Sequence, residues 1–123
     1  MDVNEDIRKD LAMLARRRKA RRTEFTVERP CDWRPSQVRN PNGLLDEYFT
    51  NEAAWELIAS KLEENHPVEV VELQKPKGKK GYVMVVNLEP GKPPLYVKLQ
   101  QGSGVIYGRS FHYSKERNRK SKK

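Results

Sequence analysis

The sequence has few of the residues that build covalent or metal-dependent sites. Its 123 residues include one cysteine, Cys31, which has no partner for a disulfide within the chain, and two histidines. No group of cysteines and histidines has the spacing of a zinc site. We therefore expect no disulfide framework, no metal and no cofactor.

Long apolar segments are also absent from the sequence. No run approaches the ~18–20 apolar residues that cross a bilayer, and no apolar stretch follows the N-terminal charges as in a secretory signal. The segment "LAMLARRRKARR" has too few large apolar residues to anchor on a membrane surface. These features favour a cytoplasmic protein without a membrane partner, and the chain length favours one domain.

The net charge of +8 is concentrated near the two ends of the chain. Residues 8–22 hold eight basic residues and one acidic residue, residues 115–123 hold six and one, and residues 23–114 hold eleven and twelve. Clustered positive charge attracts phosphate backbones without sequence specificity, although it also occurs in solubilising tails. The basic residues expected to contact nucleic acid are Arg16, Arg17, Arg18, Lys19, Arg21 and Arg22, with Lys77, Lys79 and Lys80 of a later turn.

The pattern along the chain predicts four regions. They are a basic helical arm at 1–22, a proline-rich connector at 23–43, an α+β domain at 44–114 and a basic disordered tail at 115–123. Within the arm, a helix from about residue 4 to residue 20 would carry a narrow apolar stripe of Ile7, Leu11 and Leu14, which could dock on the domain or on a partner. Within the connector, Trp33 is expected to pack on the domain.

The α+β domain is expected to begin with its strongest helix, over residues 49–66. Trp55, Ile58 and Leu62 share one face of that helix, as in a helix that packs on a core. Short connections between the strand candidates that follow favour an antiparallel meander. The predicted fold is α+β, with one or two helices on a curved four-stranded antiparallel sheet whose strands are 68–74, 82–89, 95–100 and 105–113.

The last two strand candidates carry a concentration of polar side chains. Alternation along residues 95–100 places Tyr96, Lys98 and Gln100 on one face of the sheet and three apolar residues on the other. The residues of the last strand that share this polar face depend on the register of one turn.

An even-length turn would bring Tyr107 and Arg109 beside Lys98. An odd-length turn or a bulge, for which Gly108 in mid-strand is a signal, would instead bring Ser110 and His112 there. The sequence leaves both registers open.

Either register gives a set of side chains that suits phosphodiester cleavage without a metal. His112 or Tyr96 could move protons at the 2′-hydroxyl and at the leaving oxygen. Lys98 and Arg109 could stabilise the charge that develops on the phosphorane. No carboxylate pair of a glycosidase is present, and Ser110 with His112 lacks the acidic partner of a serine hydrolase. The simpler alternative is a solvated sheet face with a structural histidine.

The stretch "LYVKLQ", followed after a short turn by "RSFHYS", resembles the end of the MqsR-type toxins of the RelE-like mRNA interferase superfamily. Those toxins end in a Tyr-x-Lys strand and a closing Ser-Phe-Lys strand. The matching positions here are Tyr96 and Lys98, then Ser110 and Phe111, with His112 in place of the lysine. The resemblance implies a RelE-like fold, catalysis by Tyr96 and His112, RNA as substrate and a cognate antitoxin protein as partner.

The leading hypothesis from the sequence is a toxin of a toxin-antitoxin system that acts as a metal-independent mRNA endoribonuclease. One alternative is a nucleic-acid-binding protein without catalytic activity that uses its basic arms. Another is a small protein-interaction module whose N-terminal helix docks on a partner.

Overall fold

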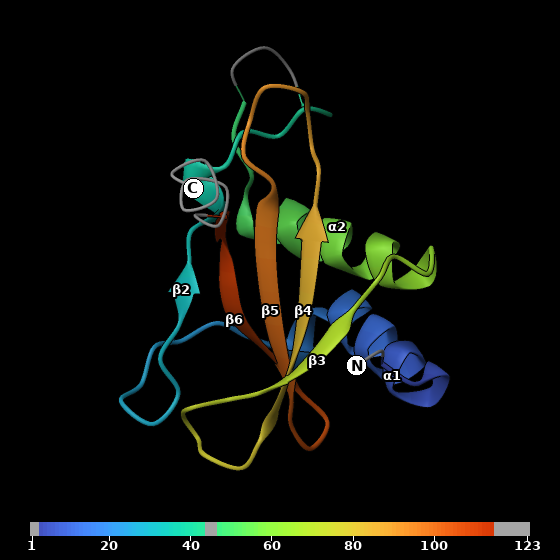
Figure 1. The fold of residues 1–123 in the computed structure, drawn as a ribbon, viewed down its shortest axis with the longest axis vertical. Coiled ribbons are helices and arrows are strands. Elements are labelled where there is room, and N and C mark those ends of the chain that lie inside the picture. Colours follow the sequence, from blue (N-terminus) through green and yellow to red (C-terminus); the bar gives the residue numbers. More distant parts are fainter. Residues whose placement is uncertain (1–2, 44–46, 115–123) are drawn as a thin grey trace, which may run out of the picture.

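The computed structural model describes residues 3–43 and 47–114, which form two helices and an open sheet (Figure 1). The helices are α1 (Glu5–Arg16) and α2 (Asn51–Glu63). The strands are β1 (Arg21–Arg22), β2 (Asp32–Trp33), β3 (Glu69–Glu72), β4 (Lys80–Val86), β5 (Leu95–Gln101) and β6 (Ile106–Tyr113). The predicted α+β class is confirmed, and the tail expected at 115–123 lies outside the described residues.

The sheet has more strands than the sequence predicted. Its order is β1-β6-β5-β4-β3, and β2 also pairs with β6. Strands β3 to β6 form the antiparallel meander that the short connections predict. Strands β1 and β2 run parallel to β6 along its outer edge. The sheet is therefore six-stranded and mostly antiparallel, because two dipeptides from the first third of the chain complete that edge.

Both helices lie on one side of the sheet (Figure 1). The alternation predicted for β5 holds, since Leu95, Val97 and Leu99 are fully buried in the core between sheet and helices. Helix α2 contributes Trp55 and Ile58 to the same core, and both are fully buried. The side chain of its capping residue Thr50 accepts a hydrogen bond from the backbone nitrogen of Ala53 at 3.0 Å, as expected for an N-cap.

Helix α1 docks on its own chain through the apolar stripe. Leu11 is fully buried, Leu14 is nearly so, and Ile7 packs against the edge of the core. The helix ends at Arg16, earlier than expected, because Arg17 adopts an extended backbone conformation before a short 3₁₀ turn. The segments expected to form the arm and the connector thus share the core and the sheet with the domain expected at 44–114.

Trp33 fixes the connector on the sheet, as the sequence predicted. Its ring lies 5.0 Å from that of Trp55 and 5.4 Å from that of Phe111, measured between ring centroids. The ring also covers Gly108, where a β-carbon would lie only 2.4 Å from an atom of the indole. Glycine at position 108 is therefore required for the close approach of the Trp33 ring to β6.

A bulge in β6 lies beside this contact. Lys98 of β5 pairs with Ser110, whereas the next residue, Leu99, pairs with Gly108. Arg109 is the additional residue of the bulge. Past the bulge, toward the start of β5, Tyr96 pairs directly with His112.

We expect Gly108→Ala to lower the free energy of unfolding by about 1–3 kcal/mol, since the added methyl group would overlap the Trp33 ring. Urea denaturation monitored by tryptophan fluorescence measures the change. The control is the same substitution in a Trp33→Leu background, where the smaller side chain leaves room and the cost should fall. An equal cost in both backgrounds would contradict the assigned contact.

Candidate functional site

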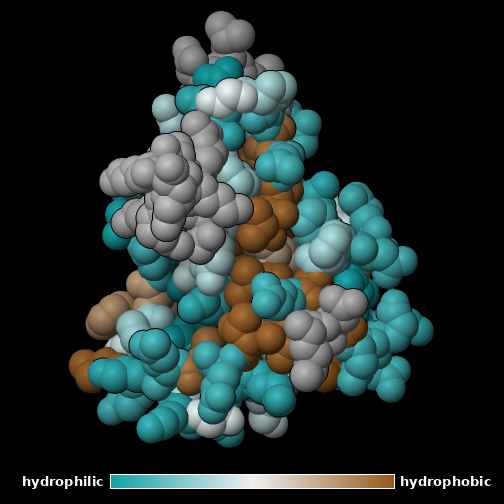
Figure 2. Space-filling view, in the orientation of Figure 1, coloured by the Kyte–Doolittle hydropathy of each residue, from teal (hydrophilic) through white to brown (hydrophobic). Residues whose placement is uncertain are grey.

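The face of the sheet opposite the helices holds a cleft of about 790 Å³. Residues of β5 and β6 form its floor, including Tyr96, Lys98 and Ser110. Residues 30–32 of the connector form one wall, and residues 71–75 at the end of β3 and in the following turn form the other. Figure 2 shows apolar side chains running down the middle of this face between hydrophilic ones. Polar and charged side chains nevertheless make up most of the lining of the cleft itself.

The bulge resolves the register question in an unexpected way. His112 stacks on Tyr96 with the ring centroids 5.5 Å apart and the ring planes at 28°. Ser110 stands opposite Lys98, and Arg109 also lines the cleft. The register predicted for a bulge, with Ser110 and His112 on the polar face, is thus confirmed, and the additional residue also lets β6 present Arg109 on the face of Lys98. The four residues predicted to be catalytic are thus brought together.

The His112 ring is held by two oxygen atoms. Its Nδ1 lies 2.9 Å from the carbonyl oxygen of Tyr113, which can only accept, so Nδ1 carries a proton. Its Nε2 lies 3.4 Å from Oδ2 of Asp32. The backbone carbonyl therefore leaves Nε2 as the atom that gains or loses a proton, and the carboxylate can stabilise the charged ring.

Asp32 is the acidic partner that sequence reasoning did not find. It reaches the site because β2 pairs in parallel with β6, which sets Asp32 opposite Ser110. The other carboxylate oxygen of Asp32 binds Arg34. The sequence feature that could have identified it was the adjacent Trp33. If Trp33 packs on the core from a strand, the residue before it must face the opposite side of the sheet.

Lys98 lies between the two walls of the cleft and is partly buried. Burial, helped by the positive charge of Arg109, lowers the pKa of Lys98 below its ordinary value. An ammonium group in this position gives up a proton more readily than a lysine in water does. Perturbed groups of this kind cluster at functional sites.

Arg109 connects the two walls of the cleft to its floor. Its Nε donates to the carbonyl oxygen of Pro30 at 2.9 Å, its Nη2 to that of Lys75 at 2.7 Å, and its Nη1 to Oε1 of Gln100 at 2.7 Å. The residue is only 6% exposed. All three guanidinium nitrogens thus hold parts of the protein, so this geometry gives Arg109 a positioning role beside the charge-stabilising one expected from the sequence.

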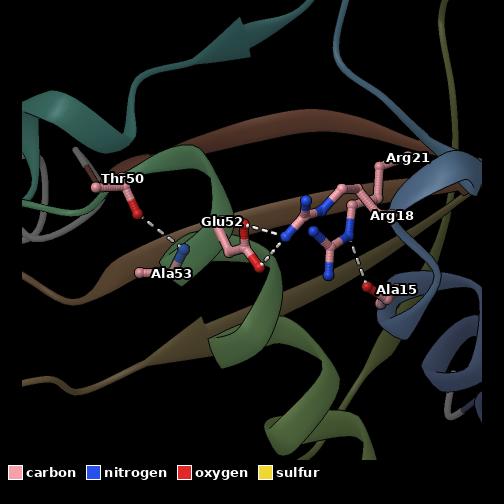
Figure 3. Close-up of polar contacts among 6 residues, drawn as sticks. All are labelled: Ala15, Arg18, Arg21, Thr50, Glu52 and Ala53. Carbon is pink, nitrogen blue, oxygen red and sulfur yellow. Dashed lines mark hydrogen bonds and ion pairs between the residues drawn. The ribbon is translucent and has the colours of Figure 1, made fainter.

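Two basic residues of the predicted arm form ion pairs with α2. Arg16 pairs with Glu63 at 2.9 Å. Arg18 pairs with Glu52 at 2.7 Å, as Figure 3 shows. Arg21 donates to the carbonyl oxygen of Ala15 at 2.9 Å, also drawn in Figure 3. These contacts turn half of the basic segment toward its own chain, on the side away from the cleft.

The remaining basic candidates lie on the surface. The side chain of Arg22 donates to the backbone oxygens of Lys19 and Arg21 at 2.7 and 3.0 Å. Lys77, Lys79 and Lys80 are exposed in and after the turn that continues from the cleft wall at Lys75. The exposed residues Arg17 and Lys19 complete the set.

Cys31 belongs to the connector wall of the cleft, where burial raises the pKa of its thiol. Within residues 3–43 and 47–114, no group of three or more histidine, cysteine, aspartate and glutamate side chains is placed to hold a metal ion. No helix in the described part of the chain is long and apolar enough to span a bilayer. Comparisons of the chain with models of protein families, with curated proteins and with solved structures found no match.

We expect Arg109→Met to lower the free energy of unfolding by at least about 2 kcal/mol, because it removes the charged donor from one buried and two partly buried acceptors. Hydrogen exchange of the backbone amides near residues 30–32 and 73–76 should also become faster. The control is Arg17→Met, which removes an exposed arginine and should change stability by less than about 0.5 kcal/mol. Equal stability of the two variants would rule out the bridging role.

We expect Lys98→Met to raise the free energy of unfolding near neutral pH. The lowered pKa means that the unfolded chain binds this proton more tightly, so charged Lys98 destabilises the folded state below its folded pKa. Stability of the wild type should rise with pH toward the ordinary lysine pKa of ~10.4, and the difference from Lys98→Met should shrink. Denaturation at several pH values measures this, with exposed Lys92→Met as the control. Matching pH profiles for the wild type and Lys98→Met would refute the burial effect.

Proposed function

We propose that this protein is a metal-independent endoribonuclease that cleaves mRNA, and that it acts as the toxin of a toxin-antitoxin pair with a RelE-like version of the α+β fold. One observation carries the proposal: the Asp32–His112 pair, the Tyr96 ring stacked on that histidine, and the Lys98 ammonium share one open face of the sheet. A cytoplasmic location and a cognate antitoxin protein belong to the same proposal.

The His112–Asp32 pair supplies a base for the first step of the proposed reaction. With Nδ1–H directed to the carbonyl of Tyr113, the lone pair on Nε2 can accept the proton of a ribose 2′-hydroxyl. The 2′-oxygen then attacks the neighbouring phosphorus. Asp32, 3.4 Å from Nε2, stabilises the imidazolium that forms.

Lys98 and Tyr96 serve the phosphate and the leaving group. Lys98 pairs with Ser110 on the cleft floor, and its ammonium can stabilise the negative charge that develops on the phosphorane oxygens. The bond from phosphorus to the 5′-oxygen then breaks, and the leaving oxygen takes a proton from the Tyr96 hydroxyl or from Lys98. The products are a 2′,3′-cyclic phosphate and a free 5′-hydroxyl. This scheme uses positive side chains for the role that a metal ion has in other nucleases.

The dimensions of the cleft favour a single RNA strand over a duplex. Its volume of about 790 Å³ is within the range of ~300–1,000 Å³ typical of sites for small molecules. The connector and the β3–β4 turn wall it on both sides, so a nucleotide must leave a base-paired helix to enter. Exposed Lys77, Lys79 and Lys80 beside one wall can attract the flanking phosphates.

Incubation of the purified protein with an mRNA transcript in EDTA tests the proposal. We expect cleavage, and His112→Ala should lower the rate ~10²–10⁴-fold because it removes the general base. Asp32→Asn should lower it less, since the imidazole remains. The matched control is His66→Ala, which removes the other histidine of the chain, a residue bound to the carbonyl of Val85 at 2.9 Å.

Intact RNA in this assay, together with normal growth of cells that express the protein, would contradict the proposal. RNA that is bound but not cut would support the alternative of a nucleic-acid-binding protein without catalysis. Equal losses in His112→Ala and His66→Ala would show that cleavage does not depend on the cleft.

A further inference from the structure

A second stacked pair, formed by Arg29 and Tyr107, adjoins the cleft beyond Arg109. The guanidinium carbon of Arg29 lies 3.9 Å from the ring centroid of Tyr107. Tyr107 pairs in register with Gln100 on β5, and the side chain of Gln100 accepts the hydrogen bond from Arg109 at 2.7 Å. Arg29 also immediately precedes the cleft wall that begins at Pro30. The pair therefore continues the floor and the wall of the cleft at one end.

The guanidinium of Arg29 packs with its plane against the Tyr107 ring, and its backbone is fixed separately. A turn fixes its backbone, since the nitrogen of Arg29 donates to the carbonyl oxygen and the hydroxyl of Thr26 at 3.1 and 2.9 Å. Among the described residues, however, the buried Nε of Arg29 has no hydrogen-bond partner. A buried N–H without an acceptor is rare in folded proteins. The contact with the Tyr107 ring is thus the interaction that orients this guanidinium plane.

The two stacks stand at opposite ends of the same row of side chains. On β5, Tyr96 carries the His112 stack, Lys98 follows two residues later, and Gln100 stands beside Tyr107 two residues beyond that. Four residues of a strand span about 13 Å. Adjacent bases of a stacked strand are only ~3.4 Å apart, so two adjacent nucleotides could reach both stacks only if the strand were extended and unstacked.

We propose that the Arg29–Tyr107 pair is a nucleobase-binding subsite. It would take a base that flanks the scissile phosphate of a single-stranded RNA, while that phosphate lies at Lys98. Splayed-out bases commonly stack on aromatic rings and on arginine planes in RNA complexes. The inference rests on the proposed function for the identity of the ligand, and it adds a binding element on the connector that the cleavage chemistry does not use.

Binding of an RNA hexamer that cannot be cleaved separates this subsite from catalysis. The probe carries fluorescein and 2′-O-methyl groups, which block attack by the 2′-hydroxyl, and fluorescence anisotropy in EDTA reports the Kd. We expect Tyr107→Leu to weaken binding about 5- to 150-fold, the loss typical of one stacked base. Two control variants leave the stacking contact intact. Tyr107→Phe retains the aromatic ring, and Phe25→Leu changes an aromatic residue of the connector that is 66% exposed. Both should bind within about twofold of the wild type.

Arg29→Lys is a second test that does not alter the sheet. It keeps the positive charge but removes the planar group, so affinity should fall while the dependence of log Kd on log salt concentration stays the same. A role in electrostatic attraction alone would leave the affinity of Arg29→Lys unchanged. Thermal denaturation shows whether each variant is folded under the binding conditions.

The results distinguish the subsite from the proposed function. If the hexamer binds to the wild type and equally well to Tyr107→Leu and Arg29→Lys, the subsite is refuted and the endoribonuclease proposal stands. If stacking variants lose affinity but transcripts stay intact in EDTA, the subsite is supported and the cleavage proposal fails. Failure of the wild type to bind the hexamer overturns the subsite, whether or not transcripts are cut.

Discussion

The packing of Trp33 against β6 is the contact on which the rest of the site depends. Its indole lies over Gly108 and between the rings of Trp55 and Phe111, so the connector is fixed to the core at this point. Because side chains of a strand alternate, the residue beside an inward-facing tryptophan faces the open side of the sheet. Asp32 reaches His112 for this reason, and Pro30 comes within reach of the Arg109 guanidinium. One apolar contact on the helix side thus organises the polar groups on the opposite side.

The bulge in β6 determines how many charged groups the cleft contains. A regular strand would direct Arg109 and Ser110 to opposite faces, whereas the additional residue allows both to line the cleft. Arg109 then joins two walls to the floor, and burial, helped by the positive charge of Arg109, lowers the pKa of Lys98. The bulge therefore affects both the shape of the cleft and the protonation of its lysine.

The sequence predicted the elements whose residue pattern is contained in one short segment. Alternation identified β5 and β6, and the apolar face of residues 49–66 identified α2. Strands β1 and β2 could not be predicted, since each has two residues and exists only through parallel pairing with a distant strand. The same pairing supplies Asp32, so the acidic partner of His112 had no signal in the spacing around the histidine. Gly108 in mid-strand signalled the bulge that sets Ser110 opposite Lys98, but counting turn residues could not decide between the two registers.

The parallel pairing of β1 and β2 with β6 determines when the cleft can form during synthesis of the chain. Pro30 and Arg109 are 79 positions apart, and Asp32 meets its histidine over a similar distance. Contacts between such distant residues form late, because the intervening chain must be closed into a loop. A ribosome must therefore make residues 106–113 before any molecule holds a complete cleft. Nascent chains without β6 carry the connector and the helices but lack Arg109, Ser110 and His112, and so lack half of the cleft floor.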